Sequence, residues 1–197
     1  MDEYFVAEMV RAIGQSERIF SVSSRMIQMY HPDRLDDAGD MYSRAWLGVP
    51  ARVGRDLTHY RRSSRVFSAC AGAAIYRREV FEEIGYFDEM HFAYLEDIDV
   101  GYRARIAGYD NIYCPAALVW HVGSGTSGSK YNSFKVKLAA RNNVYLNYKK
   151  YAVLTAYHKC DSDRSGDFRE IFNFSGNSGL EKIIWRSERR HTDGKEV

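Results

Sequence analysis

Three stretches of this chain place apolar residues at helical spacing, and a glycine follows each of them. Glycine just past the last apolar position is a common end for a helix, so the pattern predicts three short helices. They cover residues 2–13 before Gly14, 78–84 before Gly85, and 95–107 before Gly108. Short apolar runs predict strands at 19–22, 26–30, 66–70, 75–76, 111–114 and 117–122. The chain therefore interleaves short helices with short strands.

Two longer segments complete the prediction. Residues 133–151 predict a longer helix, whose buried face we expect to carry Phe134, Leu138, Tyr145 and Tyr148. Residues 31–65 show no sustained period, so we expect a long loop there, and such loops are usually functional or mobile. Its second half carries six arginines and one acid, which suits a solvated surface or one that contacts phosphate or anionic lipid. We divide the chain into a domain at 1–151 and a polar tail at 152–197 without an assigned role.

Composition excludes several classes of protein. Of the 197 residues, 45% are hydrophobic and 27% are charged, which is ordinary globular usage and excludes wholesale disorder. The formal net charge of +2 is too balanced to indicate a nucleic-acid partner, and no apolar run approaches the ~18 residues of a membrane span. Cys70, Cys114 and Cys160 are too far apart for a structural zinc site, so we expect reduced thiols in a cytoplasmic protein.

Acidic residues gather at the predicted start of helix 95–107. Carboxylates at that position are favoured by the helix dipole, so capping explains Glu96 and Asp97. The alternative is that one of them acts as a general base, for which a rigid helix start is a good mount. Asp99 and Arg103 are four residues apart, which predicts an ion pair on the helix surface.

His121 ends a predicted strand and precedes a loop rich in glycine and serine at residues 123–129. It is either a structural residue or a ligand for a divalent metal, beside a loop that closes over a phosphate. The loop is not a nucleotide P-loop, because the strand, lysine and helix of that motif do not surround it.

Several sequence blocks follow one another in a fixed order. They are residues 68–78 (SACAGAAIYRR), 85–89 (GYFDE), 94–99 (YLEDID), 102–105 (YRAR), Gly108-Tyr109, Pro115-Ala116 and His121. This ordered set resembles the C-terminal half of family 2 glycosyltransferases, and the subgroup that it resembles most is the rhamnosyltransferase-like enzymes of bacterial surface polysaccharide synthesis. The resemblance is strong from residue 66 to residue 151 and weaker before it.

The resemblance implies a GT-A fold, which is a Rossmann-like α/β sandwich that binds a nucleotide-sugar donor and a divalent cation, Mn²⁺ or Mg²⁺. It implies a single inverting displacement onto a glycan or lipid-linked acceptor. The resemblance also implies roles for residues at matching positions. Asp97 would be the catalytic base, with Glu96 beside it, and Gly72, Ala73 and Ala74 would line the donor-sugar and acceptor region. Asp88 would shape the acceptor side, and His121 would contact the metal or the diphosphate.

The family also has a donor-binding half with a metal-binding Asp-x-Asp motif, for which we find no counterpart ahead of helix 2–13. We therefore expect a partial GT-A sandwich with a mixed sheet that lacks the N-terminal nucleotide-binding strands. On this interpretation the 197-residue chain binds nucleotide sugar weakly and transfers sugar negligibly. Asp36, Asp37 and Asp40 are not expected to replace the motif.

Two other functions stay open at this point. The chain could be an inactive module that only binds a partner or glycan, and an exposed sheet edge would then predict homo-oligomers. It could also be a metal-dependent hydrolase that uses Asp88, Glu96, Asp97 and Asp99. For the glycosyltransferase, the basic residues between 52 and 65 would suit a lipid-phosphate acceptor at the inner face of the plasma membrane.

Overall fold

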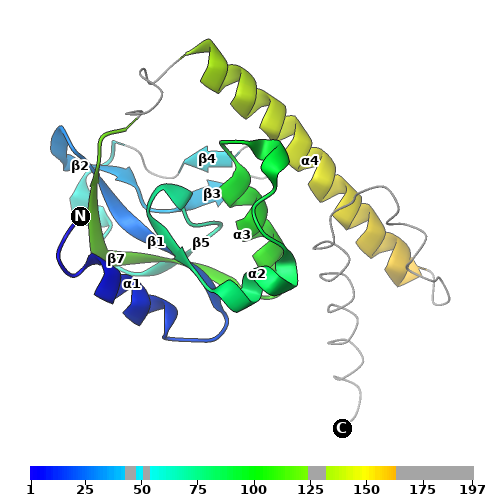
Figure 1. The fold of residues 1–197 in the computed structure, drawn as a ribbon, viewed down its shortest axis with the longest axis horizontal. Coiled ribbons are helices and arrows are strands. Elements are labelled where there is room, and N and C mark those ends of the chain that lie inside the picture. The colour runs from blue at the N-terminus through cyan, green and yellow to red at the C-terminus, as the bar shows by residue number, and fades with distance from the viewer. Residues whose placement is uncertain (43–47, 51–53, 124–131, 163–197) are drawn as a thin grey trace, which may run out of the picture.

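The computed structural model describes residues 1–42, 48–50, 54–123 and 132–162 of the chain (Figure 1). The helices are α1 (Phe5–Ile13), α2 (Arg78–Ile84), α3 (Glu96–Ile106) and α4 (Ser133–Ser162). The strands are β1 (Ile19–Gln28), β2 (His31–Asp37), β3 (Asp40–Tyr42), β4 (Gly48–Pro50), β5 (Ser64–Val66), β6 (Ala74–Tyr76) and β7 (Asp110–His121). Short 3₁₀ turns stand at η1 (Leu57–His59), η2 (Ala71–Ala73) and η3 (Glu89–His91). The three short helices that glycine ends are confirmed.

The main sheet is mixed. Its strand order is β2-β1-β7-β5, and β6 pairs with the first half of β1. Strands β1 and β7 run parallel, whereas the β1–β2, β1–β6 and β5–β7 pairs are antiparallel. Strands β3 and β4 form a separate hairpin. A mixed sheet with helices packed on it confirms the predicted α/β class.

Strands β1 and β7 are each continuous where the sequence predicts two short strands. The register shifts between Ser24 and Arg25, where β7 accommodates extra residues between Cys114 and Leu118. The extra residues of β7 stay outside the ladder, and pairing resumes beyond them with a shifted register. Ser23 and Ser24 interrupt the apolar pattern of β1, which is why the sequence predicts that the first strand ends at residue 22. Both serines are fully buried within the continuous strand.

The predicted long loop at residues 31–65 is wrong, because β2, β3, β4 and β5 lie within it. Strand β2 shows no alternating apolar pattern, since its first four residues are exposed and Leu35 is its buried apolar residue. Hydrogen bonding to β1 makes this segment a strand, and that pairing cannot be read from β2 alone. The apolar run from Val66 to Cys70 is likewise mostly not strand, because β5 ends at Val66.

The helices cover both faces of the sheet, as consecutive residues of β7 show (Figure 1). The Asn111 side chain donates to the Gly101 carbonyl of α3 at 3.1 Å, whereas Ile112 belongs to the core formed with α1. Successive side chains of a strand point to opposite faces, so α1 and α3 lie on opposite faces of the sheet. The described residues form three apolar clusters. One contains Met9, Ala12, Ile19, Val22, Ile112, Cys114 and Ala117, and the second contains Phe20, Val80, Phe81, Ile84, Val100, Ala104 and Ala107. The third contains Leu35, Ala38, Val66 and Tyr113.

Helix α4 passes along the side of the body that carries α2 and α3, and it extends past residue 151 to Ser162 (Figure 1). Leu138 is buried as expected, but Phe134 and Tyr148 are 57% and 62% exposed, so their predicted burial is wrong. The helix instead turns polar residues to the body. Lys150 is buried with its ammonium 4.8 Å from the centre of the Tyr102 ring, and burial lowers its pKa to about 7.

None of the helices in the described part of the chain has the length and apolarity that crossing a lipid bilayer requires. Residues 163–197, most of the predicted tail, and the glycine- and serine-rich segment after Gly123 lie outside the described residues.

Candidate active site

Asp97 stands in the first turn of α3, directly beside the small-residue segment that precedes β6. Its Oδ2 accepts a hydrogen bond from the Ala71 backbone N–H at 3.2 Å, and its Oδ1 accepts one from the Ile98 N–H at 2.8 Å. Ala71 begins the turn η2, which also contains Gly72 and Ala73 and leads into Ala74. The structure therefore brings together the base and the binding segment that the family resemblance implies.

A close helix approach fixes this arrangement. A Cβ atom built on Gly101 would lie 2.4 Å from the Ser68 Cβ, so only glycine lets α3 lie this near residues 67–68. Gly101 is one helical turn after Asp97, and Ser68 is three residues before Ala71. The contact thus presses the start of α3 against η2. Ala71 and Gly72 are exposed, so this side of the Asp97 carboxylate borders solvent.

Four carboxylates form what we call the acidic cluster: Asp37, Asp40, Glu96 and Asp97. Asp37 ends β2 and Asp40 begins β3, and the tight turn between them passes through Gly39 at φ 87°. The Gly39 N–H donates to Asp37 at 2.6 Å, and the Ser68 hydroxyl donates to Asp40 at 3.3 Å. Asp37 and Asp40 are only 6% and 7% exposed.

The sequence interpretation missed Asp37 and Asp40 as site residues. They do not form an Asp-x-Asp motif, and they lie in a segment predicted to be a loop. The sequence carries no clear signal for them. Leu35 and Ala38 are apolar residues on either side of Asp37, but only the structure shows that they are buried.

Burial and mutual repulsion raise the pKa values throughout the acidic cluster. Burial, with the charges of Asp97 and Asp36 adding to it, raises the pKa of Asp37 to about 7. Burial and the charges of Asp97 and Asp37 raise the pKa of Asp40 to about 9. Burial also raises the pKa of Asp97, and burial with the Asp97 charge raises that of Glu96. None of the ion pairs found among the described residues includes one of these four carboxylates.

This arrangement suits proton transfer. A base whose pKa lies near neutral pH accepts a proton more readily than an ordinary aspartate and still loses it at working pH. Unneutralised carboxylates also favour bound cations. The cluster can therefore take up a proton, attract a cation, or do both.

His121 lies at the end of β7 and contacts a different acid. Its Nδ1 is 2.5 Å from Asp36 Oδ2, and the side chain is 45% exposed. An imidazole oriented by a carboxylate through Nδ1 can present Nε2 to a metal, which is the usual arrangement of metal-binding histidines. The described residues thus place an imidazole here with an acid that could orient it toward a metal. The charge of His121 acts on the pKa of Asp37, so this pair borders the acidic cluster.

Asp88 belongs to a second group of charges, which we call the α3–α4 network: Asp88, Asp99, Arg103 and Lys149. The Lys149 Nζ lies 2.7 Å from Asp88 and 2.9 Å from Asp99. Arg103 donates to Asp99 at 3.0 Å and to the backbone carbonyls of Ile84, Gly85 and Tyr86. The predicted Asp99–Arg103 pair is confirmed, but it is buried and not on the surface, because α2 and α4 cover that face of α3.

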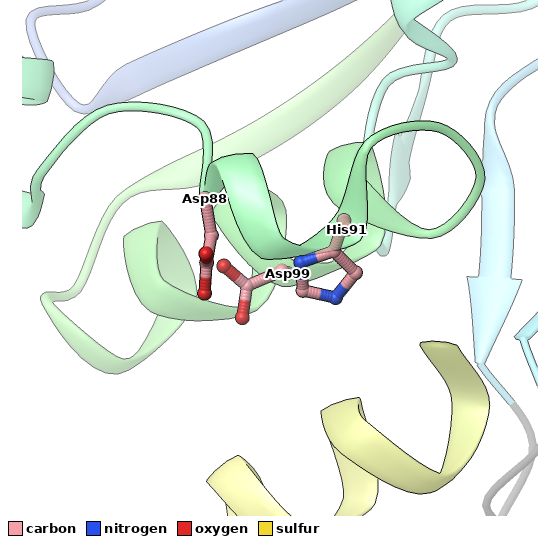
Figure 2. Close-up of side chains that lie close together, drawn as sticks. All are labelled: Asp88, His91 and Asp99. Carbon is pink, nitrogen blue, oxygen red and sulfur yellow. The ribbon is translucent and has the colours of Figure 1, made fainter. Parts of the chain in front are cut away.

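Asp88, His91 and Asp99 place their ligand atoms within 4.8 Å of one another (Figure 2). This convergence among the described residues could suit a metal ion. The Lys149 ammonium, however, already contacts both carboxylates. Although burial acts to raise the pKa of Asp88, the hydrogen bond and charge of Lys149 hold it below its usual value. The Lys149 ammonium therefore balances the charge of Asp88 and Asp99 in the place where a metal ion would bind.

A family model described as "Glycosyltransferase like family 2" matches residues 8–144, which include the acidic cluster, the α3–α4 network up to Arg103 and His121. This chain belongs to glycosyltransferase family 2. The resemblance seen in the sequence is thereby confirmed.

Two curated relatives of this family 2 chain come from Mycobacterium tuberculosis, strains CDC 1551 / Oshkosh and ATCC 25618 / H37Rv. Both are named N-acetylglucosaminyl-diphospho-decaprenol L-rhamnosyltransferase, and both are 42% identical to it over 52 residues. The match covers 26% of this chain and 17% of each relative.

The hydrolase alternative needs Asp88, Glu96, Asp97 and Asp99 at one site. Two of those acids, Asp88 and Asp99, instead contact Lys149, apart from the acidic cluster. The family match and this separation both favour glycosyl transfer over hydrolysis at a shared metal centre.

Proposed function

We propose that this chain carries the catalytic base of an inverting glycosyltransferase and that Asp97 is that base. The observation that supports it most is the placement of Asp97. A carboxylate with a raised pKa is held in the first turn of α3 by backbone N–H groups, beside the solvent-exposed Ala71–Gly72 segment. A base must be both reachable and rigid, and this position provides both properties.

In the proposed reaction, Asp97 takes the proton from an acceptor hydroxyl. The acceptor oxygen forms a bond to the anomeric carbon of the donor sugar as the bond to the nucleoside diphosphate breaks. The electron pair of the broken bond leaves with the diphosphate oxygen. The raised pKa favours a proton on Asp97 after transfer.

A divalent cation is part of this proposal. His121, oriented by Asp36, would be one protein ligand, with diphosphate oxygens and water completing the coordination. A bound cation would neutralise the charge that develops on the leaving diphosphate. Asp37 and Asp40 would border Asp97, and at neutral pH their raised pKa values leave Asp40 protonated and Asp37 partly protonated.

The segment Gly72–Ala74 would border the sugar. Small side chains leave room for a ligand to approach the backbone, and Gly72 is exposed beside Asp97. Asp88 would act less directly on the acceptor side, because its carboxylate is bound by Lys149 and Tyr145. It would support the acceptor region by fixing η3 against α4.

For the substrates, we propose a nucleotide-activated deoxyhexose as donor and a diphosphate-linked lipid or glycan as acceptor. The names of the two relatives support this choice. Arg55, Arg61 and Arg62 are exposed near η1, which suits an anionic acceptor at the inner face of a membrane. We propose a cytoplasmic location in peripheral contact with that face. A homo-oligomer is a further proposal, based on the open edges of the sheet.

A transfer assay tests the function. The purified protein would be incubated with Mn²⁺, a labelled nucleotide sugar and a short polyprenyl diphosphate acceptor, alongside a reaction without acceptor. We expect only a small amount of acceptor-dependent product, because the sequence predicts weak donor binding and negligible transfer by these 197 residues. Its anomeric configuration, read by NMR, should be opposite to that of the donor. A product with retained configuration, or release of free sugar with no transfer product, would contradict the proposal.

A further inference from the structure

The segment just before Glu96 and Asp97 adopts a backbone conformation that side chains disfavour. Phe92, Tyr94 and Leu95 have φ values of 61°, 69° and 69°. In the described part of the chain, no other non-glycine residue has a positive φ. A side chain disfavours this conformation sterically, so the conformation persists only where the surroundings hold it in place. The strain of this fold is therefore concentrated immediately before the proposed base.

One side chain of α4 contacts this strained segment along its length. The Asn142 amide nitrogen donates to the backbone carbonyls of His91, Ala93 and Tyr94 at 2.8, 2.7 and 2.8 Å. Asn142 is fully buried. The two N–H groups of a single amide thus serve three carbonyl oxygens of an irregular loop, one of these bonds being shared, away from solvent.

The partners of Asn142 determine which way its amide points. Backbone carbonyls can only accept, so the nitrogen must face the loop. The Asn142 oxygen accepts from the Arg141 guanidinium at 3.0 and 2.9 Å, and a guanidinium can only donate. Arg141 also donates to the carbonyls of Met90 and His91. Together the two residues hold four carbonyls between positions 90 and 94.

The held segment leads directly into the base. The Leu95 carbonyl accepts the first hydrogen bond of α3, from the Asp99 N–H at 3.0 Å. Asp97 lies two residues after Leu95 and projects to the Ala71 N–H. Any relaxation of residues 92–95 toward ordinary φ values would rotate the first turn of α3 and move the Asp97 carboxylate away from η2.

We propose that Asn142 is a positioning residue for Asp97. It acts through the strained loop: its amide holds residues 91–94 in the conformation that sets the direction of the Asp97 carboxylate. This inference rests on the proposed role of Asp97 as base, but the mechanical part concerns the loop alone. The two parts can therefore be tested separately.

The test compares Asn142→Leu with Asn143→Leu, a matched change on the next residue of α4, which takes part in none of the loop hydrogen bonds above. Leucine has a size close to that of asparagine and offers no donor. The rate of amide hydrogen exchange at residues 90–98 measures how firmly the loop is held. For Asn142→Leu we expect exchange there to rise at least about tenfold while β1 and β7 stay protected, and for Asn143→Leu we expect no change.

The rate of sugar transfer tests the second part of the proposal, that Asn142 positions Asp97. A misplacement of about 1 Å can cost about 100-fold in rate, so we expect kcat of Asn142→Leu to fall by about that factor while the donor KM stays within about threefold. A lost fold would instead reduce the active fraction and raise exchange everywhere. If that happens, Arg141→Leu receives the same measurements, with a smaller local rise in exchange expected.

The outcomes separate the two ideas. If residues 90–98 of Asn142→Leu exchange hydrogen as slowly as in the wild-type protein, the Asn142 contacts do not determine the loop conformation. The same result in Arg141→Leu decides the question if Asn142→Leu does not fold. Faster local exchange with unchanged kcat overturns the positioning of the base. If the wild-type protein transfers no sugar, the proposed function fails, and the exchange data still decide whether Asn142 holds the loop.

Discussion

The acidic cluster and the α3–α4 network are two groups of buried carboxylates that share helix α3 and differ in how their charge is balanced. In the network, Asp88 and Asp99 each lie within 3 Å of Lys149, and Arg103 also contacts Asp99. In the acidic cluster, Asp37, Asp40, Glu96 and Asp97 have raised pKa values. No cationic side chain among the described residues pairs with them.

This difference distinguishes carboxylates with a structural role from carboxylates suited to a chemical role, although both kinds lie on helix α3. Asp97 and Asp99 are two residues apart, yet Asp99 faces α4 and its lysine whereas Asp97 faces η2 and solvent. Carboxylates that the fold balances by its own cations hold elements together. Carboxylates that it leaves unbalanced cost stability, and such costs are typical of sites where ligands or protons bind. Each prediction below breaks one side of this contrast.

The largest effect is expected from Asp97→Asn. Asparagine keeps the shape and can still accept from the Ala71 N–H, but it cannot take the acceptor proton at neutral pH. We expect kcat to fall by at least about 1,000-fold, which is the upper part of the range for losing a general base. Circular dichroism and the melting temperature should show an intact fold. Normal turnover in this variant would remove Asp97 as the base.

Lys149→Met breaks the network and leaves two carboxylates without their shared cation. Removing one partner of a buried pair costs about 3–5 kcal/mol, because the remaining charge stays buried. We expect a loss of about 3 kcal/mol in the free energy of unfolding, measured by urea denaturation. Lys137→Met is the matched control on the exposed side of α4, and it should change stability by less than about 0.5 kcal/mol. Equal effects of the two variants would show that the network does not hold α4.

Asp40→Asn removes a buried titratable group from the acidic cluster and should have a smaller effect of opposite sign. The pKa of Asp40 is about 9 in the folded protein against an ordinary value of 3.8. Between these pH values the folded state keeps a proton that the unfolded state releases, so the free energy of unfolding falls as pH rises. At pH 8 we expect Asp40→Asn to be more stable than wild type by about 1 kcal/mol or more, and at pH 4 nearly equal to it.

Urea denaturation at several pH values measures this difference. Asp33→Asn is the control, because Asp33 is an exposed aspartate on the same β2 segment, and its pH dependence should match wild type. Parallel stability curves for wild type and Asp40→Asn between pH 4 and pH 8 would mean that the cluster is not under electrostatic strain.

The same contrast shows which features of the fold and of the site can be predicted from the sequence. The short helices, their glycine ends and the Glu96-Asp97 pair at the start of α3 follow from the local pattern, because helical periodicity and end signals act within a few residues. The order of the family blocks also pointed to Asp97 and to the 72–74 segment, and these residues do lie beside each other.

Other features depended on contacts between distant segments. Strand β2 forms because β1 offers it a hydrogen-bonding edge, and that pairing brings Asp37 and Asp40 close to Asp97. Helix α4 turns Asn142 and Lys149 inward and leaves Phe134 and Tyr148 exposed, because polar partners on α3 and the strained loop face it.

The sequence by itself determined the helices and the residue types that carry the chemistry, since those depend on neighbours a turn or two away. Only the tertiary structure decided which carboxylates receive a cation and which remain unbalanced. That outcome depends on burial and on charges contributed from segments dozens of residues apart, and no local pattern contains either quantity.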